Sequence, residues 1–209
     1  MTQLVPIIFA AVIGFGHAFE ADHLVAVSSI VTKRTKLKLA IKDGIYWGLG
    51  HTSTILLIGI TIILGKLVID EIYFSYLEAC VGIMLLFIGI YRLRSIIQGG
   101  AMESHAHLVN DKGHHHVAYG IGAVHGLAGS GVMVLLVMTE IKDTVPSLLY
   151  LLIFGLGSVA GMLVASGLFS LPFSKLFTQN RKVQQALIVL SSALCIFFGS
   201  KVIYQNLFV

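Results

Sequence analysis

Four ionisable side chains fall within seven residues of an otherwise apolar stretch near the N-terminus: His17, Glu20, Asp22 and His23. On a regular helix, His17, Glu20 and His23 share one face because they are spaced three residues apart. Asp22 then points about 100° away from His23. Two interpretations stay open. In the first, Asp22 orients another residue of the site and does not contact a bound metal itself. In the second, the glycines at positions 14 and 16 let the helix open, so that the Asp22 side chain points toward the site, as broken helices do in transporters.

Imidazole combined with carboxylate is a ligand set that suits nickel, cobalt, zinc and copper. Such a site needs neutral histidine and ionised carboxylate, so binding should release protons and weaken in acid. Histidine also titrates near neutral pH, which allows metal movement to be coupled to protons. Proton translocation without a metal would use the same residue types and remains an alternative.

Three histidines on three different predicted spans, His23, His51 and His125, lie at a similar depth. Each is seven or eight residues from the end of its span on the same membrane side, or about 10–12 Å deep. His17 and Glu20 lie deeper. Taken singly, His125 is better explained as an interhelical hydrogen-bonding residue, whereas a cluster of ionisable groups inside a membrane indicates function. We therefore expect a metal site formed by His17, Glu20, Asp22, His23, His51 and His125.

The composition predicts the kind of protein that must hold these residues. The 209-residue chain is 56% hydrophobic and 11% charged, with a mean hydropathy of +0.91, whereas soluble domains carry about 25% charged residues. Apolar stretches of spanning length recur along it. We expect an all-α polytopic membrane protein, neither an enzyme nor a nucleic-acid-binding protein, whose N-terminal stretch is a permanent span rather than a cleaved signal. The six predicted spans are Leu4–Val31, Gly44–Val68, Phe74–Leu93, Val117–Met138, Val145–Leu171 and Val183–Tyr204.

The basic residues are distributed asymmetrically between the predicted loops. Eleven of the fourteen fall in the three connections on one side: Lys33, Arg34, Lys36, Lys38, Lys42, Arg92, Arg94, Lys112, Lys175, Arg181 and Lys182. By the positive-inside rule this side is cytoplasmic. We therefore expect a multi-pass protein of the plasma (inner) membrane with both termini outside.

The two halves of the chain resemble each other. GFGHAFEADHLVAV aligns without gaps on GAVHGLAGSGVMVL and pairs His17 with His125, and YWGLGHTSTIL aligns on IFGLGSVAGML and pairs His51 with Ser158. The paired positions are 34 and 33 residues apart. Two three-span repeats must insert in opposite orientations, which is the recurring plan of secondary transporters. We predict a first repeat over residues 1–100, a histidine-rich cytoplasmic loop over 101–116 and a second repeat over 117–209.

The predicted loop carries five histidines that could also meet a metal: His105, His107, His114, His115 and His116. Histidine-rich tracts bind transition metals and can concentrate or sense them. A polar loop with incidental histidines is the alternative, and the tract does not distinguish import from export.

The first cluster resembles the signature of the nickel/cobalt transporter (NiCoT, NicO) family, a histidine followed after four residues by Asp-His. Here these are His17 and Asp22-His23, and Leu-Gly-His-Thr around His51 resembles the family's second motif. The resemblance implies metal recognition by His17, Asp22, His23 and His51, with nickel or cobalt as transported substrate and no required cofactor.

The chain also departs from the larger family members. Glu20 stands where they have Asp, Ser28-Ser29 stands where they have Asp-Asn, and their later Gly-Phe-Asp-Thr-Ala-Thr-Glu motif is missing. VHGLAGSG, which begins at Val124, instead resembles the compact six-span branch of urease-accessory UreH-like proteins.

The resulting prediction is a secondary transporter of divalent transition metals, whose partners are the metal ion and the lipid bilayer. A homo-oligomer or an accessory subunit is compatible with it, and nucleic acid is not expected. The alternative is a membrane accessory or thiol–disulfide redox protein that supports metalloenzyme maturation, because Cys80 and Cys195 both lie in apolar segments. No proline or charged neighbour tunes either thiol, and lone buried cysteines are usually apolar packing residues.

Overall fold

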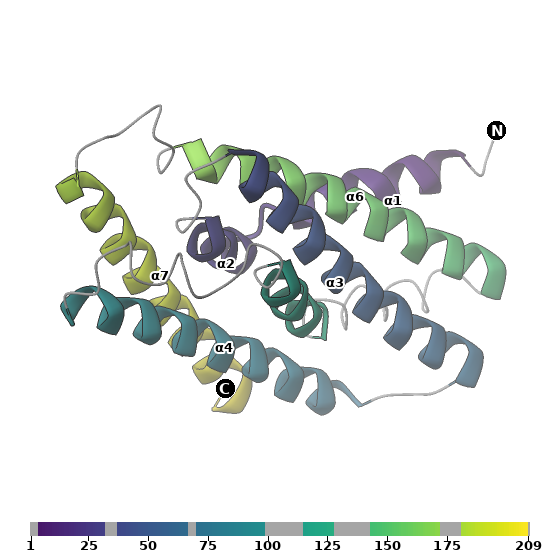
Figure 1. Ribbon diagram of the computed structural model, residues 1–209. Coiled ribbons are helices and arrows are strands. Elements are labelled where there is room, and N and C mark those ends of the chain that lie inside the picture. The colour runs from purple at the N-terminus through teal and green to yellow at the C-terminus, as the bar shows by residue number, and fades with distance from the viewer. Residues whose placement is uncertain are drawn as a thin grey trace.

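The computed structural model describes residues 4–31, 37–66, 70–98, 115–127, 143–171 and 181–208, and the regular structure in this part of the chain is helical. The helices are α1 (Leu4–His17), α2 (Ala21–Val31), α3 (Leu37–Gly65), α4 (Glu71–Ile97), α6 (Thr144–Ser170) and α7 (Arg181–Leu207). A further helix covers residues 115–127 and is drawn in teal green, without a label, near the centre of Figure 1. The expected all-α class is confirmed.

Four of these helices, α3, α4, α6 and α7, are long and apolar enough to cross a membrane. Residues 8–17 and 21–31 qualify together as a fifth span, bent by 58° at a short break. The described residues thus contain four helices that could span a membrane, or five spans if the bent pair is one, as expected for a membrane protein. Of the predicted fourth span, residues 117–127 are helical, and those from 128 to Met138 lie outside the described residues.

The predicted first span over Leu4–Val31 contains a break, as in the opened-helix alternative. Residues 18–20 form a turn, in which the amides of Phe19 and Glu20 donate to the carbonyls of Gly16 and His17. These three-residue bonds tighten the end of α1 and use carbonyls that the helix leaves open. α2 restarts with Asp22 in its first turn, where a carboxylate is favoured by the positive end of the helix dipole.

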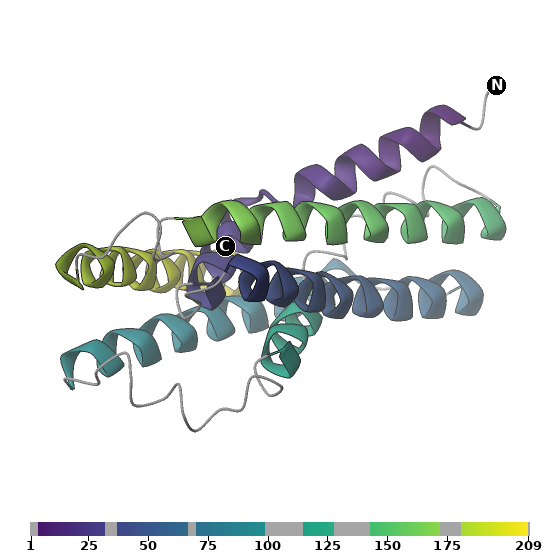
Figure 2. The ribbon, with the colours of Figure 1, turned by 45° about the horizontal axis from the view of Figure 1, so that its top comes forward.

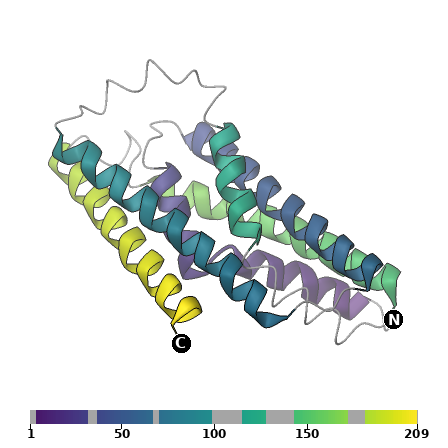
Figure 3. The same cartoon turned by 90° about the horizontal axis from the view of Figure 1, so that it is seen from below.

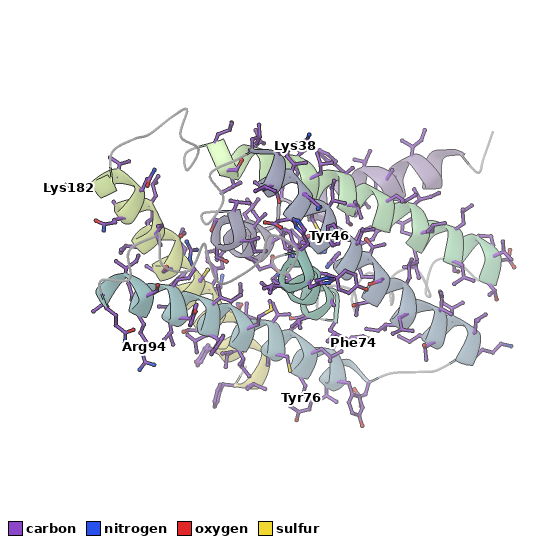
Figure 4. The ribbon with its side chains drawn as sticks, viewed as in Figure 1. Lys38, Tyr46, Phe74, Tyr76, Arg94 and Lys182 are labelled. Carbon is purple, nitrogen blue, oxygen red and sulfur yellow. The ribbon has the colours of Figure 1, made fainter. Side chains whose placement is uncertain are left out.

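The long helices pack in pairs, α3 along α6 and α4 along α7, and α1 lies along α6. Figures 1 and 2 show α1, α3 and α6 as one group and α4 with α7 as another, with α2 between them. Seen from below in Figure 3, the start of α3, the end of α4 and the start of α7 lie at one end, and both termini lie at the other. Lys38, Arg94 and Lys182, labelled in Figure 4, belong to these three helix ends.

Glycines allow the closest helix contacts. A Cβ on Gly14 of α1 would collide with the carbonyl oxygen of Phe154 of α6, and one on Gly122 would collide in the same way with the carbonyl oxygen of Trp47 of α3. Small residues at such points let backbones in a membrane approach closely. α1 is therefore seated on α6, and the helix of residues 115–127 is seated on α3.

A second pair of contacts follows the same arrangement. Gly157 of α6 abuts the carbonyl of Ala11 of α1, and Gly50 of α3 abuts the carbonyl of Tyr119. In the alignment of the two halves, Gly157 corresponds to Gly50 and Ala11 corresponds to Tyr119, so these two contacts are equivalent. The contact of Gly14 with Phe154 likewise falls on that of Gly122 with Trp47.

Large apolar side chains face outwards along the long helices, as expected for surfaces that meet lipid. Phe87 and Tyr76 on α4, Leu156 on α6 and Phe197 on α7 are exposed. The interior around Trp47 and Phe154, by contrast, contains several polar residues among the fully buried side chains, three of them histidines. These buried histidines make the interior the candidate location of the functional site.

Candidate metal-binding site

The break between α1 and α2 brings the two histidines of the first cluster together. His17 ends α1 and His23 lies in the first turn of α2, and their ring centroids are 4.4 Å apart. The side chains are buried, at 4% and 0% exposure. The chain direction changes between them, so both rings point to one place from two helices.

His51 completes this group from α3. Its ring centroid lies 5.2 Å from that of His17 and 5.2 Å from that of His23, and the side chain is fully buried. Each of the three residues offers a nitrogen within 4.8 Å of the others. Metal–nitrogen bonds of about 2.0–2.1 Å place opposite ligand nitrogens about 4 Å apart, so small side-chain movements suffice to bind one cation.

The nitrogens that face this point lack other partners. Among the described residues, Nε2 of His17, Nε2 of His23 and both ring nitrogens of His51 are buried without a hydrogen bond. A buried polar atom left unpaired costs about 1–3 kcal/mol. Such unpaired groups in a folded protein are rare, and a missing ion is a recognised explanation.

The two carboxylates contact the outer edges of the rings. Nδ1 of His17 donates to Oε1 of Glu20 at 2.8 Å, and Nδ1 of His23 donates to Oδ1 of Asp22 at 3.1 Å. These bonds fix the tautomer and turn Nε2 of each ring inwards, as carboxylates behind metal-bound histidines do. The structure combines the two interpretations of Asp22, because the helix is opened and Asp22 also holds the ring of another residue, His23.

His125 reaches the same region from the helix of residues 115–127. Its ring centroid is 4.6 Å from that of His23, and its Nε2 lies 3.3 Å from Oδ2 of Asp22. Asp22, His23 and His125 form a second group whose ligand atoms lie within 4.8 Å of one another. The expected set is thus brought together: Glu20 and Asp22 at the rim, with half-exposed and 30% exposed side chains, and four histidines inside.

Aromatic rings close the site. The Trp47 ring lies 5.7 Å from His23 and 5.9 Å from His125, and the Phe154 ring lies 5.5 Å from His17. An apolar shell excludes water and strengthens the attraction between a cation and its ligands. A cation held here would be dehydrated.

Comparison with known proteins gives one relative of similar length. The urease accessory protein UreH of Bacillus sp. (strain TB-90) is 39% identical over 202 residues, which cover 93% of this chain and 88% of the relative. The chain belongs to the UreH family. A scan of protein families finds no match, and no solved structure matches.

Membership of the UreH family confirms the resemblance drawn from the motifs, that of a UreH-like branch of the nickel/cobalt transporters. It also confirms the prediction that the chain is not an enzyme.

Of the histidine-rich tract of this UreH-family chain, His105, His107 and His114 lie outside the described residues. His115 and His116 begin the helix of residues 115–127. His115 is buried, and its Nδ1 donates to Oδ1 of Asp43 at 2.7 Å.

Asp43 is the buried ionisable residue that the sequence analysis missed. It is 1% exposed and joins α3 to the helix of residues 115–127 through His115, which also stacks on Tyr46 (labelled in Figure 4) at 5.1 Å. The available signal was its spacing, because Asp43 lies four residues before Trp47 and eight before His51, on one face of the helix.

The two cysteines do not form a disulfide. Cys80 is exposed, whereas Cys195 is buried and its thiol contacts the carbonyl oxygen of Val25 at 3.6 Å. The contact joins α7 to α2, which is a packing role for Cys195.

Proposed function

We propose that this UreH-family chain is a secondary transporter that carries a divalent transition metal, nickel or cobalt first, across the membrane. The observation that carries the proposal is the convergence of His17, His23 and His51, buried and with unpaired nitrogens, at one point between three helices. A cation that loses its water on the way through a membrane needs replacement ligands, and these imidazoles provide them. No nucleotide-binding loop occurs in the sequence, so ion gradients or the membrane potential would supply the energy.

The choice of metal follows from the ligands. Three imidazoles with carboxylates behind them suit nickel, cobalt, zinc and copper, whereas magnesium and calcium prefer all-oxygen sites. The relative is named a urease accessory protein. We propose that this chain likewise serves metalloenzyme maturation, by moving the metal that the enzyme needs.

The proposed architecture is six spans in two inverted repeats. The exchange of glycine contacts between the halves supports it: Gly14 on Phe154 corresponds to Gly122 on Trp47. Two repeats related by a pseudo-twofold axis in the membrane plane bring their first helices onto equivalent partners, with the site near the interface.

The proposed orientation places the basic helix ends in the cytoplasm. These are the start of α3, the end of α4 and the start of α7, with Lys38, Arg94 and Lys182. Both termini then lie outside, and the pair of Asp43 and His115 near the start of α3 lies on the cytoplasmic side of the metal site.

The test is uptake of nickel and cobalt into proteoliposomes that contain the purified full chain. The native protein is compared with a variant in which both His23→Ala and His51→Ala are made, and with Ser158→Ala. Ser158 is equally buried and aligns with His51. Circular dichroism establishes that all three proteins are folded.

We expect uptake by the native protein and by Ser158→Ala, and none above empty vesicles for the double variant. An absence of metal uptake by the native protein across pH and imposed potential would contradict the proposal and favour an accessory role without transport. A pH-sensitive dye inside the same vesicles tests the remaining alternative, because proton flux in the absence of metal would favour proton translocation.

A further inference from the structure

The second group of ligands, Asp22, His23 and His125, has features of a binding position of its own. His125 is 1% exposed, and neither of its ring nitrogens has a hydrogen-bond partner among the residues that the structure describes. Its Nε2 lies 3.3 Å from Oδ2 of Asp22, which is within ion-pair distance. A buried imidazole and a carboxylate this close, with His23 beside them, are placed as ligands of one cation would be.

His23 belongs to both groups, and its two ring nitrogens have different surroundings. Nδ1 faces Asp22 at 3.1 Å, and Nε2 is unpaired. The two nitrogens of an imidazole point in different directions from the ring. A cation bound to Nε2 and a cation bound to Nδ1 therefore occupy two separate positions.

We infer that the chain has a second metal position, formed by Asp22, His23 and His125, next to the position formed by His17, His23 and His51, and that the transported cation passes between them about the His23 ring. This inference rests on the proposed function and specifies the path within it. The first position has three neutral ligands. The second includes a carboxylate, which neutralises part of the charge of the divalent cation.

Asp22 changes its role between the two positions. With the cation on Nε2 of His23, Asp22 accepts the proton of Nδ1 and orients the ring. With the cation on Nδ1, Asp22 is a ligand, and the Nδ1 proton is released to the solvent that reaches the partly exposed Asp22. Nε2 takes up one proton from solvent once the cation has left it, so one proton is released and one is taken up.

Burial gives the two positions an order. The three residues of the first position are 0–4% exposed, whereas the Asp22 side chain is 30% exposed. Water can reach a partly exposed carboxylate and exchange with the cation there. The second position is the one at which the cation enters from or leaves to solution.

The helices that supply the ligands divide accordingly. His17 and His51 come from α1 and α3, and His125 comes from the helix of residues 115–127. α2 supplies His23 to both positions and Asp22 to the second. A shift of the helix of residues 115–127 relative to α2 would open the second position and leave the first intact. The two positions can thus be filled one after the other.

The experiment uses the purified full chain with Ni²⁺ as probe, in three forms: native, His125→Asn and His51→Asn. Equilibrium binding is measured by calorimetry, uptake in proteoliposomes, and bound-nickel ligands by X-ray absorption. Loss of a residue beside a metal position changes affinity or activity by about 10–100-fold. We expect His125→Asn to bind Ni²⁺ within about threefold of the native protein and to lose about tenfold or more of its uptake.

For His51→Asn we expect binding that is weaker by about tenfold or more, with a larger share of oxygen ligands around the metal than in the native protein. Uptake by His125→Asn at the native rate would overturn the second position, as would complete loss of Ni²⁺ binding in His51→Asn. Should His125→Asn not fold by circular dichroism, His125→Gln takes its place.

Failure of the proposed function has a different signature, because the native protein would then take up neither nickel nor cobalt. Native uptake together with native-like uptake by His125→Asn would overturn only the second position.

Discussion

His17 and His125 occupy equivalent positions when the two halves of the chain are aligned, and their helices make equivalent contacts through Gly14 and Gly122. The chemistry around them differs. The first half adds Glu20, Asp22, His23 and His51, whereas the aligned positions of the second half carry Ala128, Ser130, Gly131 and Ser158. The glycine contacts recur in both halves, whereas most of the side chains that we propose to bind metal lie in the first half.

The difference teaches that scaffold and site depend on separate residues here. The glycines determine how closely helices approach, and histidines can be gained or lost without disturbing those contacts. An asymmetric site on a pseudo-symmetric scaffold lets a cation meet unlike ligands on its two sides. The following predictions test this separation, from the largest effect to the smallest.

The largest effect is expected from His51→Ala compared with Ser158→Ala. Removing His51 takes away a ligand, and we expect nickel uptake to fall by about 100-fold. Removing the Ser158 hydroxyl, which donates to the carbonyl of Phe154 within its own helix, should leave uptake within about twofold. Equal losses in the two variants, measured in proteoliposomes, would mean that the halves share the chemistry as well as the packing.

The scaffold should respond in the opposite, symmetric way. Gly14→Val and Gly122→Val both place a side chain against a backbone carbonyl, and overpacking of this kind costs about 1–3 kcal/mol or more. We expect similar drops in Tm for the two variants, measured by thermal unfolding of the metal-free protein in detergent. A large drop in one variant and none in the other would contradict the equivalence of these contacts.

The free energy of unfolding of the metal-free protein should be lowered by the unpaired nitrogens of His51. His51→Leu replaces two unpaired buried nitrogens with an apolar side chain of similar size, and we expect the free energy of unfolding in a chelator to rise by about 1–3 kcal/mol. Ser158→Leu adds volume at the aligned position and should lower it. A destabilised His51→Leu would show that the nitrogens of His51 are satisfied in the absence of metal.

Acid should weaken nickel binding, because imidazole binds metal in its neutral form. Protons and the cation therefore compete for the same ring nitrogens, and the competition grows as the pH falls. We expect affinity, measured by calorimetry, to decrease as the pH is lowered, with proton release on binding in acid. Affinity that is constant or rises in acid would argue against imidazole ligands.

The smallest effect is expected from replacing Cys80 and Cys195 together by serine. Cys195 packs between α7 and α2, and Cys80 is exposed, so uptake should stay within about twofold of native. Complete loss of function in a folded double variant would instead support a thiol–disulfide role.

Much of the site could be predicted from helical spacing and depth. Spacing places His17 and His23 on one broad stripe of a continuous helix, although the structure brings the two rings together through the break between α1 and α2. His51 and His125 were expected at a depth that matches that of His23 on other helices. The membrane environment indicates that these residues are functional, since ionisable side chains inside a membrane are rare and usually mark functional sites.

The break after His17 could not be fixed in advance. The sequence allowed both a continuous and an opened helix, and the choice depends on the seating of α1 against α6 at Gly14, a tertiary contact. The pairing of Asp43 with His115 was missed for a similar reason. Both residues looked like parts of basic or polar loops, and only the close approach of two helices makes them a buried pair.

The central claim is that His17, His23 and His51 together bind the transported cation. Nickel K-edge X-ray absorption on the purified native protein tests it most directly, with Ser158→Ala as reference. We predict imidazole nitrogens as the dominant ligands at about 2.0–2.1 Å in both proteins, and their loss when His23 and His51 are both changed to alanine. Nickel bound only by oxygen, or an unchanged spectrum in the double variant, would contradict the account.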